Sequence, residues 1–268
     1  MMTNSQKALP VIKSLWIGDR LGRIEKLAYK SFVANGHTME LFVYDDVKNV
    51  PKGVVLRDAN LILPREDIFE YKDKKSVVGF SDWFRYKMIY NEGGVWVDAD
   101  MICLRPFSFA NEVVFGRQED GVVNNAVVGA PPGHSLFGFM AKQAASPNDF
   151  LPFDSFRVKR RKLKRRFLQG NKRGNVKWGE AGPLGLSQAV EHFNLGILAL
   201  PVRAFYPIHP AHWEQVFDST FFDVERFFPD SYGIHLWNEM MRRKPGFNKE
   251  GDFPKDSLIE LLAEKYDL

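Results

Sequence analysis

The order of apolar and polar positions predicts a strand, a helix and a second strand near the start of the chain. Residues 11–18 (VIKSLWIG) form a mostly apolar run that stops at a glycine, which is typical of a buried strand. Residues 20–35 place apolar side chains at near-helical spacing, and Gly36 follows as a helix-terminating glycine. A further apolar run begins at Glu40 (ELFVYDD). This order is a βαβ unit, so the sequence predicts a parallel sheet.

Two later segments also have apolar positions at helical spacing. Residues 81–91 (SDWFRYKMIYN) predict a helix with Ser81 as its N-cap, and Gly93 lies just past its end. Residues 183–193 (PLGLSQAVEHF) predict a helix with proline in its first turn, where the missing N–H breaks no helical hydrogen bond. The pattern therefore adds two helices to the first βαβ unit.

Short apolar runs predict three more strands, at residues 95–97 (VWV), 112–116 (EVVFG) and 126–130 (AVVGA).

No Gly-x-Gly-x-x-Gly follows the first strand, so the dinucleotide-binding fingerprint is absent. The chain shows no repeat or low-complexity linker, and only one segment breaks its composition. We therefore expect one α/β domain over residues 1–268, with a Rossmann-like, mainly parallel central sheet flanked by helices.

The composition is that of an ordinary globular protein, because hydrophobic residues make up 45% of the 268 residues. The single cysteine, Cys103, excludes an internal disulfide and fits a reducing compartment. The start of the sequence lacks the apolar run of a signal peptide, and no stretch reaches the roughly 20 apolar residues that a membrane span needs. The sequence therefore predicts a cytoplasmic protein.

The break in composition is a basic segment, residues 157–173 (RVKRRKLKRRFLQGNKR), which holds ten basic side chains and no acid. Without these ten charges the net charge of +4 would become −6. A broken apolar stripe runs through the cations, formed by Val158, Leu163, Phe167 and Leu168. This pattern predicts a basic helical insertion over residues 155–175 that lies on an anionic membrane, as a peripheral protein on its inner face.

Two alternatives apply to the basic segment. It can be a solvated surface with no partner, or its cations can contact nucleic-acid phosphates. No recognised nucleic-acid-binding motif accompanies it, so we expect no nucleic-acid partner.

The segment with the clearest chemistry is GGVWVDADM, residues 93–101, in which two aspartates follow a short apolar strand. Asp98 and Asp100 share strand parity, so both carboxylates can point to one side. Hard oxygen ligands at the carboxyl end of a strand suit Mg²⁺ or Mn²⁺, which would share its ligand shell with substrate phosphates. The alternative is that the pair caps a loop by accepting backbone N–H groups.

The preceding helix offers a second pair of charged residues, because Asp82 and Arg85 are neighbours on one helix face. An arginine there can bind phosphate or hydroxyl groups, and an aspartate can accept hydrogen bonds from sugar hydroxyls. The alternative is an intrahelical ion pair on the surface, which contributes very little stability.

Together, residues 81–106 (SDWFRYKMIYNEGGVWVDADMICLRP) resemble the sugar-transferase family that contains the DXD sugar-binding region. The shared pattern is Ser-Asp, then Arg, then Gly-Gly, then Asp-x-Asp, then Pro. That family, of the glycosyltransferase family 32 type, includes bacterial capsular-polysaccharide and lipopolysaccharide transferases and fungal mannosyltransferases, and the clostridial glucosylating toxins are distant relatives. Weaker matches are IKSLWIG, NNAVVGAPPGHSLF, EAGPLGLSQA and GIHLWNE.

The resemblance implies a GT-A fold and a glycosyltransferase, specifically a hexosyltransferase that retains the anomeric configuration. It implies a nucleotide-sugar donor, with a UDP-sugar favoured, and Mn²⁺ or Mg²⁺ as the cofactor. The acceptor would be a glycan or a lipid-linked glycan in the synthesis of surface polysaccharide such as capsule or lipopolysaccharide.

By position, the resemblance gives roles to individual residues. Asp98 and Asp100 would hold the metal and the ribose, with His235 as the third protein ligand of the metal. Asp82 and Arg85 would hold the sugar and act in catalysis, together with Glu180. The remaining residues of the donor site would be Trp16, Asn124, Asn125, Trp237 and Asn238.

Two mechanisms that retain the anomeric configuration are compatible with the sequence. Retention needs either a carboxylate nucleophile, for which Asp82 and Glu180 are the candidates, or attack on the same face as the departing phosphate, which we favour. Trp16 can stack on the nucleobase or fill the core.

Two other classes of protein share parts of this pattern. VWVDADMI resembles the first motif of haloacid-dehalogenase-like phosphatases, and GDFPKD from Gly251 resembles their last acidic motif. In those enzymes Thr or Val stands two positions after the second Asp, where this chain has Ile102, and the motif lies near the N-terminus. A non-enzymatic protein that binds nucleic acid or membranes through the basic segment is the third hypothesis.

Overall fold

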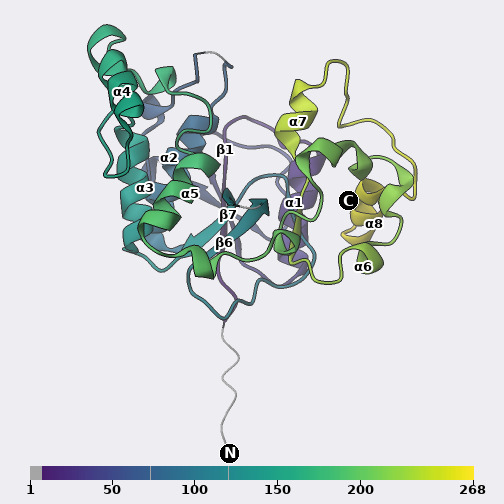
Figure 1. The fold of residues 1–268 in the computed structure, drawn as a ribbon. Coiled ribbons are helices and arrows are strands. Elements are labelled where there is room, and N and C mark those ends of the chain that lie inside the picture. Colours follow the sequence, from purple (N-terminus) through teal and green to yellow (C-terminus); the bar gives the residue numbers. More distant parts are fainter. Residues whose placement is uncertain (1–7, 73, 120) are drawn as a thin grey trace, which may run out of the picture. The chain divides into compact units, whose positions relative to one another are not determined.

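The computed structural model describes residues 8–72, 74–119 and 121–268 (Figure 1), and these residues form two compact units. Unit 1 is built from three stretches of the chain, namely residues up to 57, Val97–Ala110 and Pro201–Leu268. Unit 2 is built from Asp58–Trp96 and Asn111–Leu200. Each unit is described separately below.

Unit 1 begins with the predicted βαβ arrangement. Strand β1 (Ile12–Trp16) leads into helix α1 (Arg23–Ala34), and β2 (Met39–Val43) then pairs with β1 in parallel. Strand β3 (Val54–Asp58) lies next to β2, which gives the order β3-β2-β1. Helix α1 forms because most of its apolar side chains recur at helical spacing and are fully buried, namely Ile24, Leu27, Ala28, Tyr29 and Phe32.

The rest of unit 1 contains a second, two-stranded sheet. Strand β5 (Met101–Cys103) pairs antiparallel with β8 (Gly233–His235), and α1 lies against β5, where Ser31 Oγ accepts a hydrogen bond from the Cys103 N–H at 2.8 Å. The remaining helices of this unit are α6 (Val224–Phe227), α7 (Asn238–Arg243) and α8 (Leu258–Lys265), and its 3₁₀ turns are Val202–Ala204, Pro210–Val216 and Ser219–Phe221.

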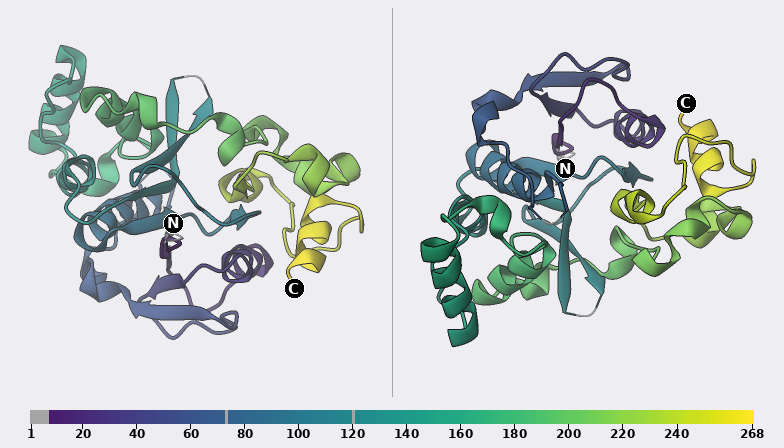
Figure 2. Two further views of the ribbon diagram at one scale, coloured as in Figure 1. Left: turned by 90° about the horizontal axis from the view of Figure 1, so that it is seen from below. Right: turned by 90° about the horizontal axis from the view of Figure 1, so that it is seen from above.

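Unit 2 has three strands in the order β4-β7-β6, namely β4 (Gly94–Val97), β7 (Val122–Ala130) and β6 (Val114–Glu119). Strands β6 and β7 form an antiparallel hairpin. Helices α2 (Val78–Glu92) and α5 (Pro183–His192) pack on β7, and α3 (Ser135–Ala145) packs on both of these helices. Figure 2 shows α4 (Phe156–Leu168) at the outer side of this helical group. The 3₁₀ turns of this unit are Ala59–Leu61, Arg65–Asp67, Arg173–Asn175 and Gly196–Leu198.

The predicted α/β class, with a mainly parallel central sheet flanked by helices, is confirmed. The runs that predicted strands at residues 95–97, 112–116 and 126–130 correspond to β4, β6 and β7. None of the helices in the part of the chain that the structure describes has both the length and the hydropathy that a bilayer crossing requires.

The expected N-cap of α2 is wrong. The helix begins three residues earlier, at Val78, because the fully buried Phe80 extends its apolar face upstream. Ser81 therefore lies inside the first turn, where its hydroxyl accepts a hydrogen bond from Arg85 Nη2 at 3.2 Å.

The expected strand parity of the two aspartates is also wrong. Strand β4 ends at Val97, and Asp98 and Asp100 lie in the turn between β4 and β5. The backbone of Met101 closes this turn by donating a hydrogen bond to the Asp98 carbonyl at 3.0 Å.

Gly93 caps the end of α2 and directly precedes β4, the strand that leads to these aspartates, so its backbone can be tested by substitution. Its φ is +67°, and a Cβ on it would lie 2.7 Å from Pro132 Cδ, whereas a Cβ on Gly133, at φ +76°, would meet nothing within 4 Å. We expect Gly133→Ala to cost about 1 kcal/mol from backbone strain alone. Gly93→Ala should cost roughly 1–3 kcal/mol more, because the steric clash adds to the strain.

Urea unfolding of the two variants and the wild type measures these differences. Equal destabilisation of the two variants would show that the close approach of Pro132 does not constrain Gly93.

Candidate functional site

Unit 1 brings together the three residues that were predicted as metal ligands. One ligand atom from each of Asp98, Asp100 and His235 lies within 4.8 Å of the others. The two aspartates occupy the turn before β5, and His235 is the last residue of β8, opposite Met101 in the β5–β8 pair. This short antiparallel pair therefore places His235 beside the aspartates, with His235 Nε2 3.2 Å from Asp100 Oδ1.

Asp100 is buried, yet its surroundings keep it ionised. Burial acts to raise its pKa, but the charge and hydrogen bond of His235 and the backbone N–H of Asn238 outweigh burial, so the pKa of Asp100 is lowered. The Asn238 N–H donates to Asp100 Oδ2 at 2.6 Å. Two carboxylates and an imidazole form a donor set that suits Mn²⁺ or Mg²⁺, so these residues fit the divalent cation that the sequence predicts.

Trp237 and Asn238, which were predicted for the donor site, lie directly beside this cluster. The Trp237 ring centroid is 4.3 Å from that of His235, and its indole N–H donates to the Ile208 carbonyl at 2.7 Å. Trp237 has a φ of +60°, which is unfavourable for a bulky residue and is tolerated because these contacts fix the ring. The turn that follows His235 is therefore held rigidly against the ligands.

A buried network behind Asp100 contains a residue that the sequence analysis missed. Glu25 on α1 is fully buried, and its Oε1 accepts hydrogen bonds from Lys249 Nζ at 2.6 Å and Asn238 Nδ2 at 3.2 Å. Glu25 therefore holds the side chain of Asn238, and the backbone N–H of the same residue binds Asp100. Its partners lie more than two hundred residues away in the sequence, so helical spacing alone gave no signal for it.

Trp16, the predicted nucleobase platform, lies at the end of β1 in the same unit and is half-buried. Its indole N–H donates to the Arg20 carbonyl at 3.1 Å, which holds the ring over the turn that contains Gly18. Among the described residues, Trp16 has no hydrogen bond to the aspartate cluster. Its place in the donor site stays a prediction.

Unit 2 assembles the residues that were predicted to hold the sugar. Asp82 Oδ1 accepts a hydrogen bond from Asn125 Nδ2 at 2.7 Å and lies 3.3 Å from Arg85 Nη2, while Arg85 Nη1 donates to the Asn125 carbonyl at 2.6 Å. The three residues are only 2%, 3% and 5% exposed, so the alternative of a surface ion pair is excluded. The Arg85 guanidinium also lies over the Trp96 ring, 4.8 Å from its centroid.

Asn124 does not join this group. Successive residues of a strand point to opposite faces, and Asn124 accordingly faces away from its neighbour Asn125 on β7. Its amide donates to Gln118 Oε1 at 2.6 Å and accepts from the Ala126 N–H at 2.7 Å. Asn124 thus stabilises the β6–β7 hairpin.

Glu180 lies in the turn before α5, next to the Asp82 group. A Cβ on Gly182 would come 3.2 Å from Asp82 Oδ2, and the Tyr86 hydroxyl, which bonds to Asn125, donates to the Ala181 carbonyl at 3.0 Å. The turn that carries Glu180 therefore covers this group.

The carboxylate of Glu180 is held by the basic helix α4. Arg165 donates to both of its oxygens, at 2.9 and 2.8 Å, and Arg161 lies 3.6 Å away. Burial acts to raise the pKa of Glu180, but these two arginines outweigh burial and lower it. This role of Arg165 could not be predicted, because the residue stands in a run of cations that resembles a solvated surface.

Two family models match this chain. "Glycosyltransferase sugar-binding region containing DXD motif" matches residues 25–119, and "Alpha 1,4-glycosyltransferase conserved region" matches residues 175–266. The first match covers Asp82, Arg85 and both aspartates, and the second covers Glu180 and His235. The predicted resemblance to DXD sugar transferases is confirmed.

Curated relatives carry names of the same class. The human alpha-1,4-N-acetylglucosaminyltransferase is 25% identical over 69% of this chain and 49% of its own length. The gorilla lactosylceramide 4-alpha-galactosyltransferase is 28% identical over 59% of this chain and 44% of its own length. The chain therefore spans about half the length of the curated relatives it matches, and the predicted enzyme class, a glycosyltransferase, agrees with their names.

A solved structure titled "PaToxG Glycosyltransferase" aligns with a TM-score of 0.47 and 16% identity, over 70% of this chain and 72% of its own.

The ion pair between Arg165 and Glu180 predicts a pH-dependent contribution to stability. Glu180→Gln removes charge-assisted hydrogen bonds, so we expect a loss of about 2 kcal/mol at neutral pH. Because the pKa of Glu180 is lowered in the folded state, the contribution is fully present above the ordinary glutamate value near 4.5 and is lost as pH falls through the lowered value.

Urea unfolding of wild type and Glu180→Gln across this pH range measures the effect, with Glu191→Gln, at an exposed position of α5, as the matched control. A stability difference that does not shrink at acid pH would contradict the ion pair.

Proposed function

We propose that this chain is a metal-dependent, retaining glycosyltransferase that moves a hexose from a nucleotide sugar, with a UDP-sugar favoured, to a glycan or glycolipid acceptor. The observation that carries the proposal is the convergence of Asp98, Asp100 and His235 in a chain that matches the DXD family model. The alternative of a haloacid-dehalogenase-like phosphatase has no comparable support, because GDFPKD forms no strand and lies in a loop before α8.

In this proposal Asp98, Asp100 and His235 would hold Mn²⁺ or Mg²⁺. When bound, such an ion supplies Lewis-acid stabilisation of the diphosphate leaving group. The protein's own contribution is to keep Asp100 ionised and fixed, since the Asn238 N–H and His235 bind its two oxygens. Glu25 and Lys249 in turn fix the Asn238 side chain.

Asp82, Arg85 and Asn125 would orient the transferred sugar. The three side chains are buried and mutually hydrogen-bonded, so they are pre-organised to exchange hydrogen bonds with hydroxyl groups. Both oxygens of Glu180 are engaged by Arg165, which counts against Glu180 as a free nucleophile. Asp82, the other candidate, is held by Arg85 and Asn125, so attack on the same face as the departing phosphate is favoured. Glu180 would then act by positioning the turn that covers Asp82.

The names of the relatives support a glycan or glycolipid acceptor, because one is called a lactosylceramide 4-alpha-galactosyltransferase. A lipid-linked acceptor requires the enzyme to work at a membrane surface. Helix α4 offers such a contact, since its apolar residues Phe156, Phe167 and Leu168 are 82%, 74% and 77% exposed.

The structure changes which cations of the basic segment can take part. Lys162 and Arg165 point inward and are buried in ion pairs with Asp154 and Glu180, so they are structural. Within the described residues, the exposed cations of α4 that have no ion pair or hydrogen bond through the side chain are Arg157, Arg160 and Lys164. An exposed face of apolar and cationic side chains fits an anionic leaflet, which is the cytoplasmic one.

The metal proposal is tested by removing one ligand. We expect Asp100→Asn to retain its circular dichroism spectrum, lose Mn²⁺ binding in calorimetry, and lose at least a hundredfold of nucleotide-sugar turnover, because one oxyanion-stabilising contact is worth about 2.7–4 kcal/mol. Asp252→Asn, at an exposed position, is the matched control.

Addition of a chelator should abolish wild-type turnover, and excess Mn²⁺ should restore it. Turnover that persists in the chelator, in wild type or in Asp100→Asn, would rule out metal dependence.

The membrane proposal is tested with vesicles. Replacing Arg157, Arg160 and Lys164 by Gln should weaken binding to anionic vesicles roughly 100-fold, at about 1 kcal/mol for each cation. The wild type should bind neutral vesicles poorly. Its binding to anionic vesicles should weaken as the salt concentration rises, because salt shortens the Debye length.

The control removes the same charge elsewhere, by Gln at the exposed positions Lys52, Lys142 and Lys255. Equal weakening by the two triple variants would show that net charge, and not α4, is responsible.

A further inference from the structure

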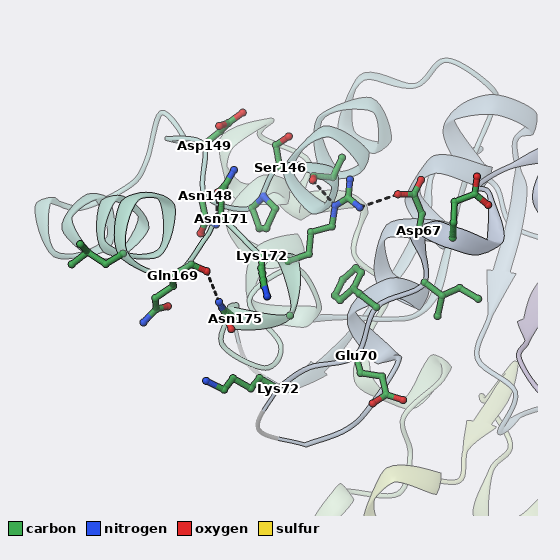
Figure 3. Close-up of a pocket in the computed structure, with 18 residues that line it drawn as sticks. Asp67, Glu70, Lys72, Ser146, Asn148, Asp149, Gln169, Asn171, Lys172 and Asn175 are labelled. Carbon is green, nitrogen blue, oxygen red and sulfur yellow. Dashed lines mark hydrogen bonds and ion pairs between the residues drawn. The ribbon is translucent and has the colours of Figure 1, made fainter.

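Unit 2 contains a polar pocket that none of the residues predicted for the metal or the donor lines, although the end of the basic segment, residues 168–173, forms part of it. It has a volume of about 1150 Å³ and is formed by three loop segments, residues 66–72, 145–149 and 168–175 (Figure 3). This volume is slightly larger than the roughly 300–1,000 Å³ that small-molecule pockets occupy. The pocket can therefore accept a ligand larger than a single sugar ring.

The walls of the pocket are tied to one another, which makes it a formed site. Arg173 joins all three segments, because Nε donates to the Ala145 carbonyl at 2.9 Å and Nη1 lies 3.1 Å from Asp67 Oδ1. Its guanidinium also lies over the Trp83 ring, 4.1 Å from the centroid. The Lys72 N–H donates to the Gly174 carbonyl at 3.0 Å, so the first and third segments are also joined through the backbone.

Several side chains of the lining remain available to a ligand. Five of them carry no hydrogen bond or ion pair through their polar ends to any described residue, namely Glu66, Glu70, Lys72, Gln169 and Lys172. All five are exposed at the rim or wall of the pocket. Figure 3 shows polar side chains coming from all three segments.

The charges of the lining select for the type of ligand. Three cations (Lys72, Lys172 and Arg173) alternate with four carboxylates (Glu66, Asp67, Glu70 and Asp149), so neither a polyanion nor a polycation is favoured. The lining also holds three exposed or partly exposed amide side chains, which both donate and accept hydrogen bonds: Gln169, Asn171 and Asn175. Sugar hydroxyls have the same dual character, so this lining matches a neutral, hydroxyl-rich ligand.

The pocket wall is connected to the turn that covers the Asp82 group. Asn148, which lines the pocket, accepts a hydrogen bond from Arg165 Nε at 2.7 Å, and the same guanidinium binds both oxygens of Glu180. Asn148 is 2% exposed, so this link is shielded from water. A ligand in the pocket would thus lie one side chain away from the residue that binds Glu180.

We propose that this pocket binds a neutral oligosaccharide, as a subsite for the non-reacting part of the acceptor glycan. The assignment to the acceptor rests on the proposed transferase function, whereas the binding of a neutral glycan does not. The two parts can be measured separately.

Binding is tested by fluorescence polarisation with three labelled neutral trisaccharides (maltotriose, raffinose and triacetylchitotriose) and with trigalacturonate as the anionic comparison. No donor and no metal ion are added. We expect at least one neutral probe to bind saturably, and the double variant Lys72→Ala with Gln169→Ala to bind it at least tenfold more weakly. The matched control, Lys142→Ala with Gln188→Ala at exposed helical positions outside the pocket, should bind as wild type does.

Several results would overturn the proposal. They are the absence of binding by every neutral probe, a preference for the anionic probe, and equal affinities of the pocket variant and the control. Because the assay contains no donor or metal ion, a loss of transfer in Asp100→Asn does not affect it. If the wild type transfers sugar to an acceptor, the double variant Lys72→Ala with Gln169→Ala should have a higher KM for the acceptor and an unchanged kcat. An unchanged KM would show that the pocket is not an acceptor subsite.

Discussion

A carboxylate taken out of water must be matched by hydrogen-bond donors or cations, and this requirement organises both units. Asp100 is matched by His235 and the Asn238 N–H in unit 1. Asp82 and Glu180 are matched by two arginines in unit 2. Arg85 lies on the same helix as Asp82, but Asn125 donates to Asp82 from β7, and the donors to Asp100 and Glu180 also come from other elements. Satisfying each acid therefore also holds separate elements together. The polar groups that define the candidate site are thus the ones that hold the surrounding backbone in place.

The sequence was most informative where chemistry is local. The βαβ unit, the helix before Gly93 and the pair Asp98 and Asp100 follow from spacing within short windows, and the structure has elements at each of these places. His235 could be linked to the aspartates only through the family resemblance, because the β5–β8 pairing that brings it there spans more than a hundred residues. The start of α2 was misplaced because a good capping residue, Ser81, lies within a helix whose buried face begins earlier.

Glu25 and Arg165 show why some of the site could not be predicted. Both are charged residues on helices, and a charged residue on a helix is usually solvated. Their burial depends on partners that only the tertiary structure supplies, such as Lys249 for Glu25 and Glu180 for Arg165. Helix α4 therefore carries both buried and exposed cations, which cannot be distinguished from the sequence alone. The inward cations, Lys162 and Arg165, are buried in ion pairs, whereas Arg157, Arg160 and Lys164 are exposed.

The two-stranded β5–β8 sheet has a consequence for how the chain can vary in length. Only three residue pairs form it, and a shift of one residue would turn every side chain of β8 to the opposite face. His235 would then point away from Asp100, although its neighbours in sequence would be unchanged. Insertions and deletions should therefore be tolerated in exposed loops of the intervening chain, but not between Asp98 and Cys103 or between Gly233 and Asn238. The spacing of a few residues in two short segments, rather than the content of the chain between them, decides whether this cluster exists.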